Sequence, residues 1–204
     1  MKRILTYLIL LISLNCLSQN TLNETDSITL SFKGSLIKNN VKQFFSMKRY
    51  CHGCYAIDKN GCITNKKIYF KTYIFWKDSD NSNWLKLLDN CGAYKKIKIS
   101  NIYINYFIEN FSEIKSKQVK KYSKKNSKTG RISEVGSNHY FMERFKFQND
   151  EDHFKTYIDY FDISNDRNEN VYFEYNTNLK IVKLSKMISE LIDQLENSNS
   201  FIRE

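Results

Sequence analysis

The chain has 204 residues and contains 32 lysines and arginines against 22 aspartates and glutamates, a formal net charge of +10. This length suits one domain with a sizeable core, and nothing marks a second domain because the chain has no proline and no glycine- or serine-rich linker. Beyond the N-terminal region no apolar run is long enough to cross a bilayer, which excludes a membrane-spanning helix there. This excess of basic over acidic residues is compatible with an anionic partner. The abundance of lysine, asparagine and isoleucine has a second explanation in an AT-rich genome.

The N-terminal region has the three parts of a secretory signal peptide. A cationic start at Met1–Arg3 precedes the apolar stretch Ile4–Leu14, and a polar region follows. We therefore expect residues 1–18 to be a signal peptide and residues 19–204 to form a single secreted or periplasmic domain. Lipoprotein anchoring through Cys16 is the less favoured alternative, because an asparagine precedes it where the processing peptidase needs a small residue.

The chain alternates between patterns typical of strands and of helices. Residues 28–50 are mixed and allow a short helix, and aromatic or β-branched runs predict the strands that follow. Apolar residues at helical spacing predict two further helices, the last one strongly amphipathic and capped from within 176–178. The expected strands are 54–57, 67–77, 84–88, 139–148, 154–163 and 171–175, and the expected helices are 102–119 and 179–195. These elements predict an α+β domain: an antiparallel β-sheet (meander) with helices packed on one face and a long C-terminal amphipathic helix.

A run of cations free of acids lies between the predicted helix 102–119 and the next strand. An acidic stretch follows it, from Asp150 to Glu174. The functional interpretation is a loop that binds an anionic polymer, and the alternative is a solvated connection whose lysines pair with the acidic stretch. Only one aromatic residue interrupts the run, so specific nucleic-acid recognition by stacking is not expected. The anion-binding candidates are Lys117, Lys120, Lys121, Lys124, Lys125, Lys128 and Arg131, within a run that begins at Lys115.

Four cysteines remain after the predicted cleavage: Cys51, Cys54, Cys62 and Cys91. Thiols outside the cytoplasm tend to be oxidised, so structural disulfides are expected, with three pairings open. A zinc site is an alternative, although the paired CxxC spacing is missing. A redox dithiol at Cys51 and Cys54 is another, but such motifs begin a helix, whereas the residues that follow here predict a strand. We expect neither a metal nor a cofactor.

Three further features have chemical interpretations that compete with structural ones. His139 is a candidate for a hydrolytic site that no known motif supports. The run from Asp162 to Glu169 resembles a calcium loop but lacks its central glycine and its closing glutamate. Trp76 and Trp84 flank a predicted hairpin loop, where they form either a cross-strand pair or an exposed platform for a sugar.

The segment from Tyr73 to Tyr94 and the cleavage region from Ser13 to Asn20 resemble small uncharacterised secreted proteins of Bacteroidetes bacteria. This resemblance implies the compartment and the class of protein, and it implies no activity. Together with the cysteines and the aromatic sheet, it favours a secreted or envelope-associated, non-enzymatic binding or structural domain that disulfides stabilise. Its partner would be an anionic polymer or a component of the cell envelope. The alternatives are a small secreted or periplasmic hydrolase and an anionic-polymer binder that uses residues 115–131.

Overall fold

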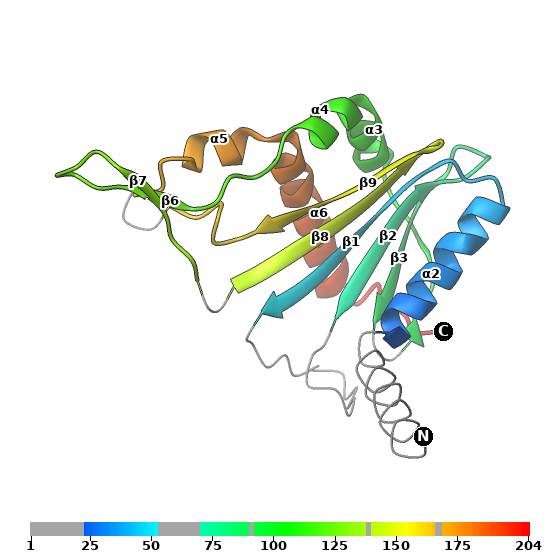
Figure 1. Cartoon of the computed structure of the whole chain (residues 1–204). Helices are drawn as coiled ribbons and strands as arrows, with labels where there is room; N and C mark the ends of the chain where they lie inside the picture. Colours follow the sequence, from blue (N-terminus) through cyan, green and yellow to red (C-terminus); the bar gives the residue numbers. More distant parts are fainter. Residues whose placement is uncertain (1–22, 53–69, 90–91, 138–139, 166–168) are drawn as a thin grey trace, which may run out of the picture.

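The computed structural model of the chain describes residues 23–52, 70–89, 92–137, 140–165 and 169–204. Groups of strands and groups of helices follow one another along these residues (Figure 1). The elements are α2 (Asn23–Lys38), β1 (Gln43–His52), β2 (Lys71–Lys77), β3 (Asn83–Asp89), β4 (Gly92–Ala93), β5 (Ile97–Lys98), α3 (Ile102–Glu109), α4 (Phe111–Ser116), β6 (Ser123–Lys125), β7 (Ile132–Glu134), β8 (Tyr140–Asn149), β9 (Asp152–Asp159), α5 (Phe173–Asn178) and α6 (Lys180–Asn197).

The described strands form one antiparallel seven-stranded sheet and a separate two-stranded hairpin, β6–β7. The order in the large sheet is β4-β3-β2-β1-β8-β9, with β5 also paired to β3. The strands β1 to β4 follow one another as a meander, and the β8–β9 hairpin adds to the other side of β1. With the long helix α6 at the C-terminal end, this architecture confirms the predicted α+β class.

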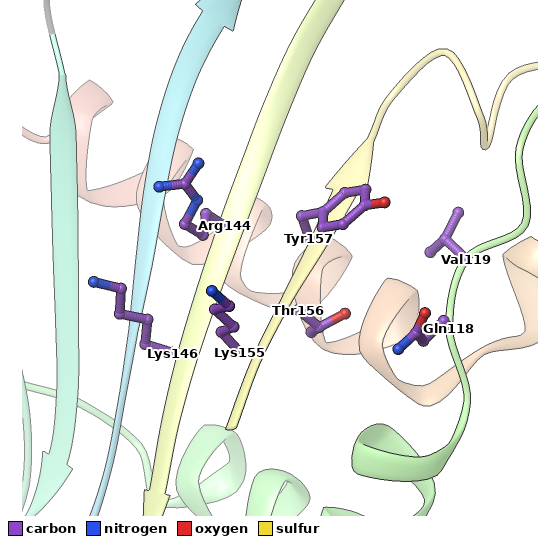
Figure 2. Close-up of a pocket in the computed structure, with 7 residues that line it drawn as sticks. All are labelled: Gln118, Val119, Arg144, Lys146, Lys155, Thr156 and Tyr157. Atoms are coloured by element: carbon purple, nitrogen blue, oxygen red, sulfur yellow. The ribbon is translucent and has the colours of Figure 1, made fainter. Parts of the chain in front are cut away.

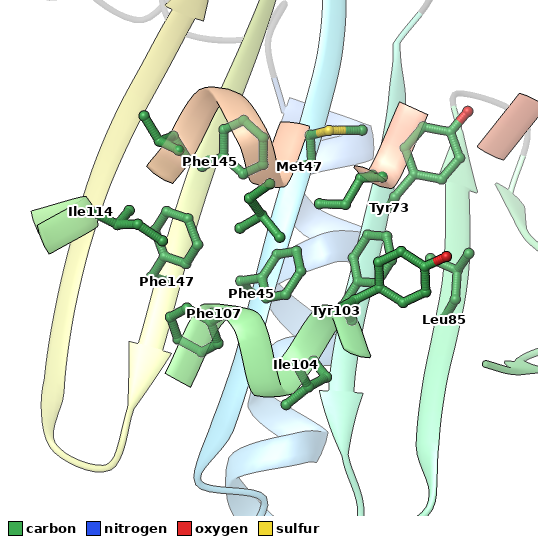
Figure 3. Packing of buried hydrophobic residues seen from close by; sticks show 14 of the residues in the cluster. Phe45, Met47, Tyr73, Leu85, Tyr103, Ile104, Phe107, Ile114, Phe145 and Phe147 are labelled. Carbon is green, nitrogen blue, oxygen red and sulfur yellow. The ribbon is translucent and has the colours of Figure 1, made fainter. Parts of the chain in front are cut away.

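The main core lies between one face of the sheet and the helices α3, α4 and α6 (Figure 3). Phe45, in the central strand, stacks on Phe75 with ring centroids 4.7 Å apart, and it meets Phe107 of α3 edge-on at 5.4 Å. Phe107 in turn stacks on Phe147 of β8 at 5.1 Å. Such aromatic pairs add to the hydrophobic stabilisation from burial, so this face anchors β1, β2 and β8 on the helices.

The opposite face of the sheet is covered only in part. α2 lies over the β2–β3 side of it, where Phe32 of the helix contacts Trp76 of β2 with ring centroids 5.4 Å apart (Figure 1). Trp76 is buried and directly faces Trp84 across β2 and β3, so the two form the cross-strand pair. The β8–β9 side of this face carries exposed polar side chains instead. One helix therefore packs against the face opposite to the other helices, and it leaves a strip of sheet uncovered.

Several boundaries differ from those predicted. The apolar residues Phe44, Phe45 and Met47 belong to β1 and not to a short helix. The sequence did not indicate this strand, because residues 43–52 contain no β-branched residue and no polar alternation. The predicted helix 102–119 is two helices, divided at Asn110, whose amide donates to the carbonyl of Tyr106.

The predicted strand 171–175 was wrong, because these residues form a turn and the start of α5. Because α5 occupies residues 173–178, α6 begins at Lys180, one residue later than predicted. Its N-cap is Leu179 and not one of the predicted residues 176–178. The predicted strand 54–57 lies outside the described residues. No helix in the described part of the chain is long and apolar enough to cross a bilayer.

Candidate functional site

The predicted anion-binding residues 115–131 lie along an extended segment after α4 and in the β6–β7 hairpin. Several of these cations have acidic partners. Lys115 pairs with Asp152 at 2.6 Å, and Lys117 pairs with Glu113 at 3.0 Å. Lys124 forms an ion pair with Glu169. Asp152 and Glu169 belong to the acidic stretch, so this stretch compensates part of the charge of the segment.

Lys121 forms an ion pair with a buried carboxylate. Its ammonium lies 3.0 Å from Asp162, which is 2% exposed and also accepts the backbone N–H of Tyr122 at 2.9 Å. Burial opposes the charge of Lys121, but the hydrogen bond and the Coulombic attraction of Asp162 outweigh it and raise the pKa of Lys121. The carboxylate of Asp162 thus anchors residues 121–122, a structural role that differs from calcium binding. The described residues contain no group of three or more potential metal ligands.

The remaining predicted cations are placed differently. Lys120 lies over the rings of Tyr172 and Tyr175, at 4.6 and 4.5 Å from their centroids. Lys125, Lys128 and Arg131 are exposed in the hairpin, and no acid of the described part pairs with them. The hairpin end is therefore the part of the predicted stretch with uncompensated charge.

The cysteine and histidine candidates fall largely outside the described residues. Cys54, Cys62 and Cys91 lie there, as does His139. The backbone of Cys51 belongs to β1 and faces Phe141 of β8. The disulfides and the hydrolytic candidate consequently stay predictions.

A buried carboxylate, Glu143 of β8, is the centre of a polar network inside the domain. It is 1% exposed, and it accepts hydrogen bonds from Arg49 at 2.8 Å, Tyr160 at 3.0 Å and Ser185 at 2.5 Å. Arg49 also donates to Ser189 of α6. Because both carboxylate oxygens are engaged and shielded, the network ties β1, β8 and α6 together and leaves no oxygen of Glu143 for a substrate.

The uncovered strip of the sheet carries a second group of cations, which we call the basic sheet face: Arg144 and Lys146 of β8 and Lys155 of β9. All three are exposed, and none has an acidic partner among the described residues. They share a face because residues two apart in a strand point the same way, and because Lys146 directly faces Lys155 across the pair. Glu143, Phe145 and Phe147 alternate with them and point into the core.

Two hollows open on the basic sheet face. The larger has a volume of about 610 Å³ and lies between β8, β9 and the segment at Gln118 and Val119 beyond the β9 edge (Figure 2). The smaller, of about 20 Å³, lies next to α2 and β2 and is lined by Thr29 and Thr72. Arg144 and Lys146 line both hollows, so the two are neighbours on this face.

Other side chains adjoin these cations. Tyr157 faces Arg144 across β8 and β9 and is 49% exposed. Tyr50 lies under Arg144, whose guanidinium donates to its hydroxyl at 3.4 Å and lies 5.6 Å from its ring centroid. Lys48 faces Arg144 across β1 and β8. Clustered cations on an open surface can attract and hold an anion, and the aromatic rings offer flat apolar contacts beside it.

Sequence reasoning missed the basic sheet face although a signal exists. In β8, Arg144 and Lys146 alternate with Phe145 and Phe147, which indicates a strand with one face in the core and the other in solvent. The register that aligns Lys146 with Lys155 and the limited cover from α2 come from tertiary structure.

Comparison with known proteins gave no match: no family model fits the sequence, and no curated protein or solved structure is significantly similar to it. The arguments for function therefore rest on the geometry of the site.

Proposed function

We propose that this protein is an exported, non-enzymatic binding domain that holds an anionic ligand on the basic sheet face. The observation that carries the proposal is the group formed by Arg144, Lys146 and Lys155, three exposed cations on adjacent strands without a compensating acid in the described structure. Like charges this close repel one another, and an anion relieves that repulsion.

The geometry of the face supports a binding role. Its cations project from a sheet whose other side is packed core. The backbone that carries them is therefore already ordered, and only the side chains have to be fixed when a ligand binds. The predicted stretch 115–131 differs, since Lys115, Lys117, Lys121 and Lys124 already have acidic partners. Its hairpin end, with Lys125, Lys128 and Arg131, is the competing location for an anion.

A matched pair of variants distinguishes the two locations. The triple variant Arg144→Gln, Lys146→Gln and Lys155→Gln removes the basic sheet face. The control variant Lys125→Gln, Lys128→Gln and Arg131→Gln removes the same number of charges from the hairpin. All six residues are exposed, so both proteins should fold with unchanged melting temperatures. Their net charges are equal, which cancels any effect of overall charge.

The measurement is the affinity for fluorescently labelled heparin, a soluble polyanion, between about 50 and 200 mM salt. We expect the slope of log K against log salt to fall by about 2–3 in the sheet-face variant, roughly one for each lost contact, and by less than about one in the control. A larger loss in the hairpin variant would move the site to residues 115–131. Equal losses in both would show attraction by net charge alone and would reject the proposal.

The exported state is a separate part of the proposal. It is supported by the composition of residues 1–18 and by the four cysteines that follow. The intact mass of the protein from its own host tests it, measured without and then with reductant. We expect a chain that begins at Gln19 and is lighter by two hydrogens for each disulfide. A chain that begins at Cys16 with acyl groups would instead identify a lipoprotein, and free thiols would reject the disulfides.

A further inference from the structure

The positive charge of the basic sheet face is confined to a short length of the strands. Arg144 lies in one cross-strand row, and Lys146 and Lys155 lie in the next, about 7 Å away. Beyond the second row come Gln148 and His153, and then the β8–β9 turn with three consecutive acids, Asp150 to Asp152.

In the other direction the row after Arg144 contains Asp159, a buried acid. Burial, opposed by a hydrogen bond from the N–H of Phe161, raises the pKa of Asp159. Asp150, Asp152 and Asp159 already pair with Lys42, Lys115 and Lys121, so neither end of the face continues the uncompensated positive charge. A long polyanion lying along the strands would therefore leave the positive area at both ends.

The face is also bounded across the strands. Thr29 and Lys33 of α2 lie on one side, and Gln118 and Val119 lie on the other. The larger hollow, of about 610 Å³, falls within the range of about 300–1,000 Å³ that is typical of small-molecule sites. The enclosure thus favours a compact ligand over a polymer.

One cation of the face is already oriented. The hydroxyl and ring of Tyr50 hold the guanidinium of Arg144 above β1. A guanidinium presents its N–H groups as a planar fork that matches two oxygens of a phosphate, whereas lysines act as point charges. Arg144 together with Lys146 and Lys155 therefore suits a group with several phosphate oxygens.

The smaller hollow supplies an independent observation. The hydroxyls of Thr29 and Thr72 line it, the two residues are 8% and 3% exposed, and neither hydroxyl has a hydrogen-bond partner within the described structure. Buried hydroxyls are normally hydrogen-bonded. At about 20 Å³ the hollow has room for one oxygen atom. Arg144 and Lys146 line it together with Lys33 and Lys48.

From these observations we infer that the ligand of the basic sheet face is a small compound with two adjacent phosphate groups. One phosphate lies over Lys146 and Lys155 in the larger hollow. The other lies against Arg144 and directs an oxygen to the hydroxyls of Thr29 and Thr72. This inference rests on the function proposed above, which requires an anion but not a compact one.

The length of the anion tests the inference. Inorganic pyrophosphate and a long-chain polyphosphate are titrated into the wild-type protein by calorimetry at one salt concentration. We expect one pyrophosphate to bind to each protein molecule. The affinity of the protein for long-chain polyphosphate, expressed per binding site, should lie within about threefold of that for pyrophosphate, because the positive area ends after two rows. An affinity that rises tenfold or more with chain length would overturn the compact ligand in favour of a polymer.

The double variant Thr29→Val and Thr72→Val tests the placement of the second phosphate. Valine has the shape of threonine without the hydroxyl, and here it removes buried groups that lack partners, so the melting temperature should stay the same or rise. Pyrophosphate affinity should nevertheless fall about tenfold or more, as expected for lost hydrogen bonds to a charged group. Unchanged affinity would reject this placement.

The two proposals fail in different ways. If long polyphosphate binds, loses affinity in the sheet-face triple variant, and pyrophosphate does not bind, the binding function stands and the diphosphate is rejected. If neither anion loses affinity in that variant, the function itself is rejected. Saturable binding of pyrophosphate that the triple variant abolishes supports both.

Discussion

The buried ion pair of Glu143 and Arg49 allows a quantitative prediction about stability. Glu143 is 1% exposed, whereas the side chain of Arg49 is 27% exposed and retains some contact with water. Burial works against the charge of Arg49, but the attraction of Glu143 and the hydrogen bond to it raise the pKa of Arg49. Arg49 therefore keeps its positive charge beside Glu143.

Removing one member of such a pair leaves the other without its counter-charge, which costs about 3–5 kcal/mol for a fully buried pair. Because Arg49 is partly hydrated, we expect Glu143→Met to lie near the lower end, at about 3 kcal/mol. Arg49→Met should cost at least as much, since it leaves a carboxylate that is almost completely shielded from solvent. With a urea m-value of about 2 kcal/mol/M, a loss of 3 kcal/mol lowers the midpoint of unfolding by about 1.5 M.

The assay is urea unfolding of the wild type, the two single variants and the double variant, followed by far-UV circular dichroism. The double variant replaces the pair by two apolar side chains, so it should cost clearly less than the sum of the singles. We expect a coupling free energy of about 1.5–3 kcal/mol. Additive effects, with a coupling below about 0.5 kcal/mol, would show that Glu143 and Arg49 do not act as a buried pair and would refute the reasoning.

Two further predictions concern the core and the response to pH. Phe107→Ala should destabilise the domain by about 3–5 kcal/mol, because the fully buried ring contacts both Phe45 and Phe147; a cost below about 1 kcal/mol in urea unfolding would contradict this packing. Burial raises the pKa of Tyr94, and Asp162 raises that of Lys121 against the effect of burial, so the native state retains protons that the unfolded chain loses above about pH 10. Stability should therefore be constant between pH 7 and 9 and fall as the pH rises through these raised pKa values. A free energy of unfolding that increases above pH 10 would contradict the sign.

Sequence patterns predicted most of the elements because their periodicity reflects burial on one side. In α6, Ile181, Leu184, Ile188 and Ile192 repeat at helical spacing and are all buried, so the helix was identified from the sequence. The strands β2, β3, β8 and β9 were predicted from aromatic and β-branched runs bounded by turn residues, and β2 and β3 proved to be buried on both faces. Residues 43–52 were missed because the run has neither polar alternation nor a β-branched residue, the signals that identify strands.

The candidate site was less accessible to sequence reasoning than the fold. The run from Lys115 to Arg131 attracted attention because its charges are adjacent in sequence, but the carboxylates that pair with Lys115, Lys121 and Lys124 come from distant positions. In the basic sheet face, by contrast, cations from different strands come together only in the folded structure. Lys155 reaches Lys146 only through the β8–β9 register, and both stay exposed only because α2 packs over β2 and β3.

The most direct test of the basic sheet face is to map a bound anion by NMR. Backbone amides of the protein are assigned, and pyrophosphate is added at constant ionic strength. The account predicts saturable chemical-shift changes that are largest around Arg144–Lys146 and Lys155–Tyr157, with little change in the hairpin from Ser123 to Glu134. Changes centred on that hairpin, or small changes spread over all lysines that never saturate, would contradict the basic sheet face as the binding site.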